Sequence, residues 1–393
     1  MKRIALLLAL LIAGTSPAVA VQKPVAVKKL KIISTVNAET MVVSGKTIIT
    51  VSNTDGSNSN ILLTGMDISG VQLWQKTIDS GADEVALAAA TDSLGNIWVA
   101  GASSALQPTE SGTVTVQTEN PDGVTVEPTT KLRGDMNLIT LWKISSLGEL
   151  LGTYTLAQSA PVLINSMSVN SSGISLVGQL EDKPLVVSAN TSGAFGKVIS
   201  IGTSKTQLNA VTRQSDGSQS VFGSSAETLA GKKLAGTRDG VLIKISKSGA
   251  IASVVRSSAP KANRAWIAAD SALALTGYVK TGKVIETAFT KFTTAFAPTW
   301  TLRIPSLGSS AVISAGNSTY GAITSNSQVA GVSGWKPTSP SVLLLSLDSK
   351  GQITSASGSS DVSEIISLAY SKELGVVGLA RTSSQSISLF TLA

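Results

Sequence analysis

Short apolar runs alternate with turn residues along almost the whole chain. Most runs are rich in Val, Ile and Thr, and clusters of Gly, Ser, Asn and Asp separate them, which is typical of β-strands joined by tight turns. Little of the chain shows the 3.6-residue period or the capped start of a helix. The clearest runs are 47–51, 97–100, 138–142, 241–245 and 341–345. The pattern predicts an all-β protein.

One landmark recurs along the chain, a short apolar run that ends in glycine. It returns roughly every 45 to 55 residues once the longer segment 105–134 is set aside, and such a period indicates a stacked or circular array. The landmark glycines are Gly101, Gly178, Gly223, Gly277, Gly331 and Gly378. A seventh copy without the glycine lies at 48–52.

Each copy has the same internal plan of four strands. A tight turn such as 92–96 joins the first strand to the second, and a glycine turn such as that at Gly70 or Gly148 joins the third to the fourth. Glycine supplies the positive φ that tight hairpin turns require. Four antiparallel strands per repeat of this length predict one blade of a β-propeller, so we expect seven blades. An open β-solenoid and a pair of β-sandwiches are the structural alternatives.

The two ends of the repeat array are complementary. The last copy ends after its third strand, and a spare strand-like segment at 25–33 precedes the first copy. We expect this N-terminal strand to be the fourth strand of the last blade, because such closure removes open sheet edges. Residues 21–393 would then form a single domain.

Three segments resemble a known repeat. Residues 81–108, GADEVALAAATDSLGNIWVAGASSALQP, are similar to the bacterial seven-bladed β-propeller repeat family, whose units begin with acidic residues and contain D-x-x-G-N-x-Y-V-x-G-x-T. Residues 134–156 and 238–255 resemble the second half of that repeat, in which an Asp precedes the third strand. Several copies lack the Asp. The resemblance implies a propeller fold, secretion and a surface location, but no single activity.

A weaker likeness connects residues 65–74 to the Trp-docking repeat of quinoprotein dehydrogenases. Those enzymes carry the tryptophan in most blades, whereas Tyr154 and Val254 stand at equivalent positions here. The chain also has no cysteine pair to line a quinone. We therefore expect no quinone and no other cofactor.

The first twenty residues have the features of a secretory signal peptide. Lys2 and Arg3 precede the apolar segment 4–13, and 18–20 supply the small residues of a cleavage site. No lipobox cysteine follows, and no second long apolar run occurs. We expect a secreted or periplasmic protein with no membrane span after cleavage. An uncleaved anchor is the alternative.

Composition excludes several kinds of chemistry. The chain has neither cysteine nor histidine, which rules out thiolate or imidazole zinc sites, Ser-His-Asp triads and disulfides. The formal net charge is +7, but no basic stretch is interleaved with aromatic residues, so we expect no nucleic-acid binding. We also expect no metal site. Large cores do not need disulfide staples, so the absence of cysteine is compatible with secretion.

Candidate binding residues lie in the longer connections. In a four-stranded meander the second-to-third-strand loops share a face with the blade-to-blade connections, and here that face carries the long loops, including a hairpin insertion at about 105–135. Binding residues concentrate on such loops. The candidates are Asp122, Arg133, Asp135, Arg238, Asp239, Trp335 and Lys336.

Each candidate also has a purely structural interpretation. Arg133 to Asp135 form an Arg-Gly-Asp tripeptide, but Asp135 and Asp239 are expected to cap the start of a third strand. Trp335 lies in a Gly- and Pro-rich loop, where it could stack on a sugar or a partner, or pack on a neighbouring loop. The hairpin could be a binding arm or a neutral insertion.

Two functions from different classes remain. The favoured hypothesis is a secreted, non-catalytic, monomeric scaffold that binds a protein or polysaccharide at the cell envelope through the face with the long loops. The alternative is a carbohydrate-active enzyme, a glycosidase or lyase, that uses carboxylates at the mouth of the central channel. A glycosidase would need two carboxylates about 5 to 10 Å apart, whereas the acidic residues are spread thinly along the chain.

Overall fold

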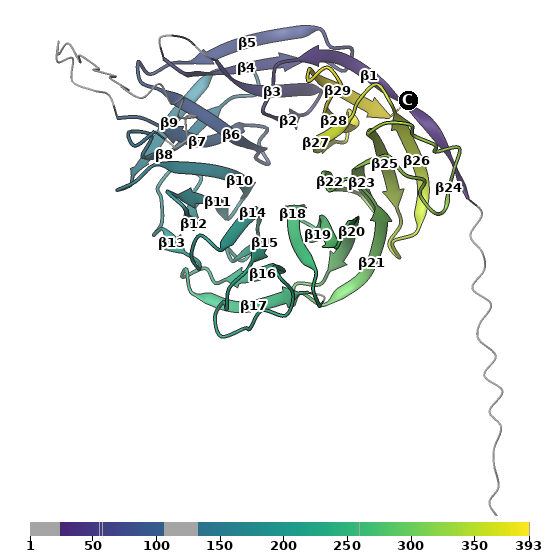
Figure 1. The fold of residues 1–393 in the computed structure, drawn as a ribbon. Helices are drawn as coiled ribbons and strands as arrows, with labels where there is room; N and C mark the ends of the chain where they lie inside the picture. Colours follow the sequence, from purple (N-terminus) through teal and green to yellow (C-terminus); the bar gives the residue numbers. More distant parts are fainter. Residues whose placement is uncertain (1–23, 55, 57, 106–132, 259, 393) are drawn as a thin grey trace, which may run out of the picture.

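The strands form a ring of radial sheets. The computed structural model describes residues 24–54, 56, 58–105, 133–258 and 260–392, and these contain strands and turns but no helix. Five separate four-stranded sheets and one nine-stranded sheet surround a central axis (Figure 1). Within the described residues there is consequently no helix that is long and apolar enough to cross a membrane.

Each four-stranded sheet is an antiparallel meander that runs outward from the axis. Blade 1 contains β2 (Thr40–Ser44), β3 (Thr47–Thr54), β4 (Asn60–Met66) and β5 (Gln72–Ile78). Blade 2 contains β6 (Glu84–Thr91), β7 (Ile97–Ser103), β8 (Leu138–Ile144) and β9 (Leu150–Ala157). Blade 3 contains β10 (Val162–Asn170), β11 (Gly173–Leu180), β12 (Lys183–Ala189) and β13 (Ile199–Ser200).

Blades 4 and 5 repeat the plan. Blade 4 contains β14 (Thr206–Arg213), β15 (Gln219–Ser225), β16 (Asp239–Ile245) and β17 (Ile251–Ser257). Blade 5 contains β18 (Asn263–Ala269), β19 (Ala274–Thr281), β20 (Val284–Phe292) and β21 (Pro298–Pro305).

The nine-stranded sheet holds two further meanders, which makes seven blades. Blade 6 contains β22 (Ser310–Ala315), β23 (Ser318–Ser325), β25 (Ser341–Leu347) and β26 (Ile353–Ser359), with the short β24 (Val332–Ser333) in its second-to-third connection. Blade 7 contains β27 (Glu364–Ser371), β28 (Gly375–Arg381), β29 (Ile387–Leu392) and β1 (Val25–Val36). The expected all-β, seven-bladed propeller is confirmed.

The N-terminal strand closes the ring and does more than its sequence suggested. From Leu30 onward, β1 pairs antiparallel with β29 as the expected fourth strand of blade 7. Its preceding residues, Val27 to Lys29, pair in parallel with β26 on the rim of blade 6, and Val25 pairs with β24. The strand also continues to Val36, beyond the expected end at residue 33. One strand therefore joins two neighbouring blades.

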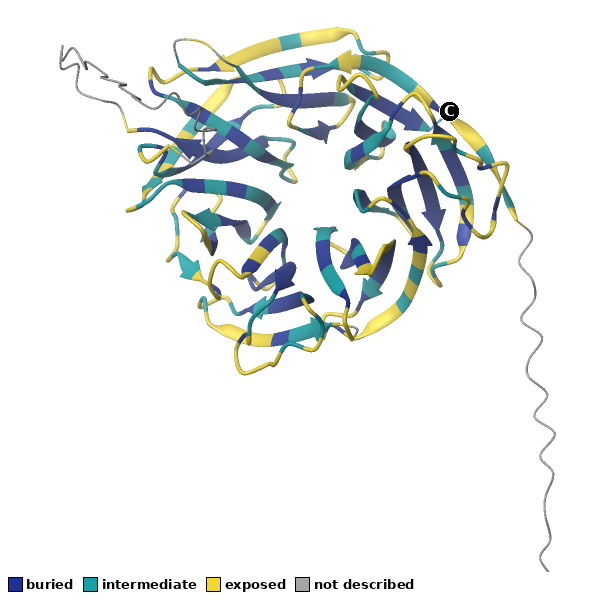
Figure 2. Ribbon diagram, in the orientation of Figure 1, coloured by how far each residue is buried: buried dark blue, intermediate teal, exposed yellow. Residues whose placement is uncertain are grey.

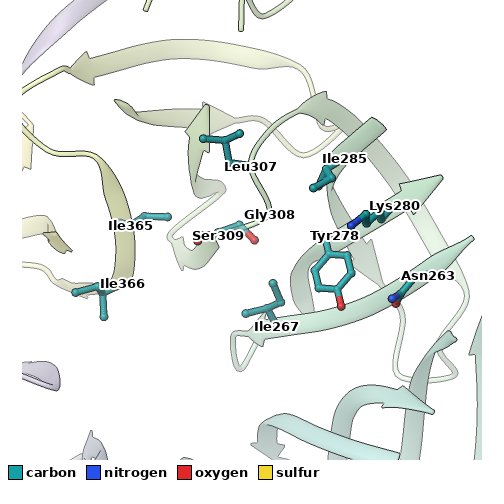
Figure 3. A pocket seen from close by; sticks show the side chains of 11 residues that line it. Asn263, Ile267, Tyr278, Lys280, Ile285, Leu307, Gly308, Ser309, Ile365 and Ile366 are labelled. Atoms are coloured by element: carbon teal, nitrogen blue, oxygen red, sulfur yellow. The ribbon is translucent and has the colours of Figure 1, made fainter. Parts of the chain in front are cut away.

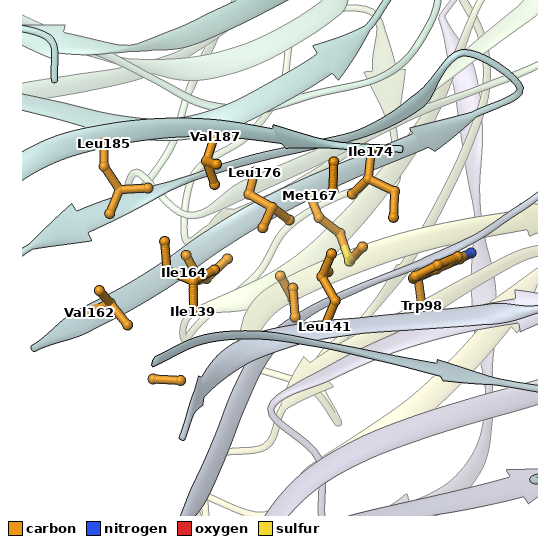
Figure 4. Packing of buried hydrophobic residues seen from close by; sticks show 14 of the residues in the cluster. Trp98, Ile139, Leu141, Val162, Ile164, Met167, Ile174, Leu176, Leu185 and Val187 are labelled. Atoms are coloured by element: carbon orange, nitrogen blue, oxygen red, sulfur yellow. The ribbon is translucent and has the colours of Figure 1, made fainter. Parts of the chain in front are cut away.

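Hydrophobic clusters fill every interface between neighbouring blades. One cluster, shown in Figure 4, joins Trp98 and Leu141 of blade 2 to Ile164 and Leu176 of blade 3. Corresponding clusters join each of the other six neighbouring pairs, including blade 7 with blade 1. Burial decreases toward the outer strands, which Figure 2 shows as largely exposed. The core is a ring of interfaces between sheets.

A β-bulge explains the landmark glycine in four blades. In blades 2 to 5 the register of the first strand shifts just after the residue that pairs with the glycine. A Cβ atom on Gly101 would lie only 1.9 Å from the carbonyl oxygen of Val85, and Gly178, Gly223 and Gly277 have the same close contact. Bulges bring two backbones close together, and only glycine fits there.

One landmark was assigned wrongly. Gly331 lies with φ at +80° in the second-to-third connection of blade 6, outside any second strand. The second strand of that blade is β23, which carries Gly321, and neither blade 6 nor blade 1 has a bulge between its first two strands. The short apolar run before Gly331 had the composition of a strand, but the loop that contains it packs against β1.

The third-to-fourth turns share a polar cap. The Asp67 carboxylate accepts hydrogen bonds from the backbone N–H groups of Ser69 and Val71, at 2.8 and 3.0 Å. Asn190 and Asp348 accept the equivalent pairs in blades 3 and 6. The fourth turn residue is a glycine with positive φ in five blades, as expected.

These glycines also dock aromatic side chains of the preceding blade. A Cβ atom on Gly148 would lie 2.7 Å from the Trp74 ring, and one on Gly193 would lie 2.0 Å from the Tyr154 ring. Trp300 covers Gly351 in the same way. The ring that lies on the turn glycine is therefore Trp in blades 1 and 5 and Tyr in blade 2.

Replacing Gly101 with Ala tests the role of the bulge. The added methyl group would overlap the Val85 carbonyl, so we expect Gly101→Ala to reduce the free energy of unfolding by about 1–3 kcal/mol or more. Urea unfolding followed by tryptophan fluorescence measures the change. Gly134→Ala is the matched control, because a Cβ there would meet nothing within 4 Å. Equal stability of the two variants would contradict the explanation.

Candidate functional site

The two faces of the ring differ in the lengths of their connections. The face that carries the second-to-third-strand and blade-to-blade connections, here called the decorated face, has the long connections of blades 2, 4 and 6. The opposite face has short turns. Residues 106–132 of the blade 2 connection, with the predicted hairpin and the candidate Asp122, lie outside the described residues. Their binding role remains a prediction.

A pocket of about 530 Å³ opens on the decorated face beside the channel (Figure 3). Topology places it there, because its wall includes Lys280 and Ile285, which adjoin the β19–β20 turn, and residues 307–309 of the connection from blade 5 to blade 6. We call it the blade 5–6 pocket. It is lined by Asn263, Ile267, Tyr278, Lys280, Ile285, Leu307, Gly308, Ser309, Ser310, Ile365 and Ile366.

Two further cavities adjoin this pocket. A cavity of about 470 Å³ shares Leu307 and Ser309 with it and continues toward blade 7, and its wall is rich in serine hydroxyls. We call it the serine groove. The first strands of six blades line a cavity of about 400 Å³ in the centre of the ring, which shares Ile366 with the blade 5–6 pocket. The three cavities are therefore neighbours that share wall residues.

The sequence did not single out this region. Asn263, Tyr278 and Lys280 belong to blade 5, whose second-to-third turn is short, while Ile365 and Ile366 come from blade 7. No motif links these positions, because blade curvature and ring closure bring them together. A search for residues that precede or follow the landmark glycines could have found only Tyr278, which directly follows Gly277.

Arg133 and Asp135 form an ion-paired group with Asp83. The Arg133 guanidinium lies 2.7 Å from Asp83 and bonds in bidentate fashion to Asp135. The Ser59 N–H and then Arg133 hold the pKa of Asp83 below its usual range, and Arg133 lowers the pKa of Asp135. The expected cap of the third strand by Asp135 is wrong, since the carboxylate faces Arg133. The group remains half-exposed on the decorated face.

Glu84 lies next to this group but is buried. Its carboxylate accepts hydrogen bonds from the N–H and the hydroxyl of Ser80, and its exposed fraction is 1%. Burial raises the pKa of Glu84 above that of an ordinary glutamate, because it disfavours the charged form.

Asp239 has a structural role. It is fully buried, pairs with the Arg256 guanidinium at 3.1 Å, and accepts hydrogen bonds from the N–H groups of Ala235 and Gly236. It therefore fixes the connection before β16, as the capping interpretation expected, and is not accessible to a ligand. Its neighbour Arg238 is half-buried and donates to the Ser224 hydroxyl at 3.2 Å.

Trp335 packs on the outer strand of its own blade. Its side chain is 7% exposed, its indole N–H donates to the Ser327 carbonyl at 3.1 Å, and its ring occupies the space beside Gly358. The interpretation of an exposed stacking tryptophan is wrong, because β1 and β26 cover the loop that looked unprotected in the sequence. Lys336 is exposed and lines a small cavity with Lys28 and Lys29 of β1.

Charge is divided unevenly across the decorated face. The connections around blades 4 and 5 carry a basic arc, while the acids there are bound internally, as with Glu227, which accepts hydrogen bonds from Thr203 and Thr206. The basic arc contains Lys205, Lys232, Lys233, Arg238, Lys261, Lys280 and Lys283. The corresponding described connections of blades 1 to 3 carry five acidic residues, Asp79, Asp83, Asp135, Glu181 and Asp182, against two basic residues, Arg133 and Lys183. A charged partner would therefore meet this face in a preferred orientation.

Asp239→Asn tests the buried ion pair. The substitution leaves the Arg256 charge buried without a counter-ion, so we expect the free energy of unfolding to fall by about 3–5 kcal/mol. Urea denaturation measures the loss. The double variant Asp239→Asn, Arg256→Met should recover part of it, because no unpaired charge remains. If the single variant loses no more free energy of unfolding than the double variant, the assignment of a buried Asp239–Arg256 ion pair is refuted.

Glu84→Gln tests the pH dependence of stability. Because the folded state raises the pKa of Glu84, the folded protein holds this proton more tightly, and stability falls as pH rises through the raised value. Above that pH the Gln variant should be at least as stable as the parent, with a flatter stability profile between about pH 4 and 7. Thermal unfolding at several pH values measures this. The exposed Glu149→Gln is the control, and the same flattening in both variants would count against the effect.

Comparisons with known proteins agree on the fold. No protein-family model matches the chain, and no curated protein matches it. The WD40 domain of Toxoplasma gondii coronin is 11% identical with a TM-score of 0.50, covering 94% of this chain and 88% of that one. The β-propeller domain of the Trilobed protease from Pyrococcus furiosus is 11% identical with a TM-score of 0.47, covering 93% and 96%. The BBS1N chain, solved in complex with ARL6DN, is 12% identical with a TM-score of 0.45, covering 93% and 98%.

At such identities a structural likeness shows the fold and nothing about ligands. The neighbours include one chain crystallised with a protein partner, and that observation concerns that protein. The repeated four-stranded sheets, the ring of interfaces and the likeness to the coronin WD40 domain lead to the same conclusion. The chain is a β-propeller.

Proposed function

We propose that the mature chain is an exported, non-catalytic binding module whose decorated face holds a protein or polysaccharide partner. The observation that carries this proposal is the combination, on one face, of the blade 5–6 pocket and the serine groove with the basic arc. A rigid ring supports this face, and the opposite face has only short turns. Rigid scaffolds that present variable connections are well suited to recognition.

The basic arc supports an acidic partner. Its lysines are exposed, and the acidic groups in the same connections are occupied by internal bonds, as in the Asp239–Arg256 pair. Complementary charge speeds association and orients the partner. A partner would place its acidic region over blades 4 and 5 and avoid the acidic connections of blades 1 to 3.

The cavities give little support to the alternative of a carbohydrate-active enzyme. Among the described residues that line the blade 5–6 pocket, the serine groove and the central cavity, Glu364 is the single carboxylate. Glycoside hydrolysis normally requires a pair of carboxylates. Glu364 accepts a hydrogen bond from the Ser309 hydroxyl at 2.8 Å, which suits a positioning role within the wall.

Export, an envelope location and a monomeric state are parts of this proposal. Export and an envelope location rest on the signal-peptide features of residues 1–20 and on the resemblance described above. The leader lies outside the described residues, so the folded domain carries the binding argument independently.

Charge reversal tests the proposed face. We expect the triple variant Lys232→Glu, Lys233→Glu, Lys261→Glu to bind fluorescent poly-L-glutamate and polygalacturonate at least about tenfold more weakly at low ionic strength. Biolayer interferometry over a salt series measures this. Added salt should narrow the difference, because it screens exposed charges.

The control variant carries Lys46→Glu, Lys247→Glu and Lys372→Glu. These exposed lysines lie in turns of the opposite face, so the net charge changes equally while the decorated face is untouched. The control should bind both polymers about as well as the parent. An equal loss in both variants would mean that net charge alone governs binding, and the proposal would fail.

A further inference from the structure

The blade 5–6 pocket contains polar atoms that have no partner among the described residues. The Ser310 side chain is only 5% exposed, and its hydroxyl makes no hydrogen bond. The Asn263 side-chain oxygen is also buried and unpaired. Buried polar groups without partners are costly, and both residues line the same cavity. A ligand that offers one hydrogen-bond acceptor and one N–H donor would satisfy them.

A lysine without an ion-pair partner lies at the same cavity. Lys280 is exposed, and no carboxylate of the described residues lies within ion-pair distance of it, while Glu286 nearby is occupied by Arg303 at 2.6 Å. Lys280 and Tyr278 are two residues apart on β19, so their side chains lie on the same face of the strand. Figure 3 shows both side chains at the pocket wall. An anionic group entering the pocket would meet the ammonium.

The rest of the wall is aliphatic. Five large aliphatic side chains come from blades 5 and 7 and from the connection between blades 5 and 6, and Tyr278 is the single aromatic lining residue. They are Ile267, Ile285, Leu307, Ile365 and Ile366. Such a wall suits a branched hydrocarbon side chain, whereas sugar rings pack best on aromatic platforms. The volume of about 530 Å³ accommodates one such side chain with its backbone.

The serine groove offers an exit path from the pocket. It shares Leu307 and Ser309 with the pocket and continues along the decorated face past Ser339 and Ser363. Serine hydroxyl groups can donate hydrogen bonds to the backbone carbonyl groups of an extended chain and accept hydrogen bonds from its N–H groups. A ligand anchored in the pocket could therefore continue along the face as an extended segment.

We propose that the blade 5–6 pocket binds the free carboxyl terminus of a peptide or protein whose last residue is aliphatic. The terminal carboxylate pairs with Lys280, the last N–H donates to Asn263, and a carbonyl accepts from Ser310. The terminal side chain packs among the five aliphatic residues, and the preceding residues lie in the serine groove. This inference rests on the proposed binding function and specifies its ligand.

Selection from a library of peptides displayed with free carboxyl termini tests the ligand class. We expect the enriched sequences to end in Leu, Ile or Val. A fluorescein-labelled synthetic hexapeptide of the enriched sequence should bind at least about tenfold more tightly than the same peptide with an amidated terminus, measured by fluorescence polarisation. Selection without a terminal preference, or equal binding of acid and amide, would overturn the proposal.

Variants of the protein test the site. Lys280→Met should weaken binding of the free-acid peptide about tenfold and leave the amidated peptide unchanged, because only the carboxylate contact is lost. Ile366→Asp should weaken both peptides. Lys183→Met is the control and should bind both peptides as the parent does, since exposed Lys183 adjoins the corresponding turn of blade 3, outside both the pocket and the basic arc. Binding that is insensitive to Lys280→Met and Ile366→Asp would place the peptide elsewhere.

The outcome separates this inference from the proposed function. If the charge-reversed triple variant loses binding of the acidic polymers while no displayed peptide is enriched, the proposed binding function is supported and the proposed recognition of a peptide carboxyl terminus is refuted. Strong binding on a glycan array, blocked by Ile366→Asp, would assign the pocket to a saccharide and likewise overturn the inference. If these variants bind the polymers and the peptides as well as the parent does, both the proposed function and this inference are refuted.

Discussion

Ring closure by β1 is the constraint on which the rest of the molecule depends. Each blade buries one surface against the blade before it and another against the blade after it, so no blade is complete by itself. The chain can satisfy all seven interfaces only if its first strand returns to its last blade, as Leu30 does between blades 6 and 7. An unclosed array would leave the edge of β29 and an apolar face of blade 7 exposed to water. Because β1 also pairs with β26, closure ties two blades at once.

Within this closed ring, small residues set how closely neighbouring parts approach. The bulge glycines let two backbones touch inside a blade, and the turn glycines let a ring from the preceding blade lie directly on the turn. Polar caps such as Asp67 hold these turns without help from the core. Contacts within each blade and contacts between blades therefore hold the ring together, and the loops on the decorated face can vary without disturbing the interfaces between blades.

The decorated face uses this freedom in two ways. In blade 4, the buried Asp239–Arg256 pair fixes a long connection and leaves its lysines free at the surface. Between blades 5, 6 and 7, a short connection leaves room for a cavity with unpaired polar atoms. The exposed lysines and the cavity thus lie on different blades. This arrangement suits a partner that the basic arc attracts first and that the blade 5–6 pocket then holds.

The sequence by itself determined the blade plan, because each repeat encodes its own strands and turns through local chemistry. The apolar runs, the turn glycines and the spare segment at 25–33 were sufficient to predict seven blades and their closure. Tertiary structure decided the site. Trp335 had the composition of an exposed loop yet became core, and Asp239 had the appearance of a ligand residue yet became a buried anchor. Conversely, Lys280 and Ile366 lie far apart in the chain and carry no motif, and only ring curvature brings them to one cavity. Local periodicity specifies elements, whereas a pocket depends on which distant elements meet, and that is settled by packing.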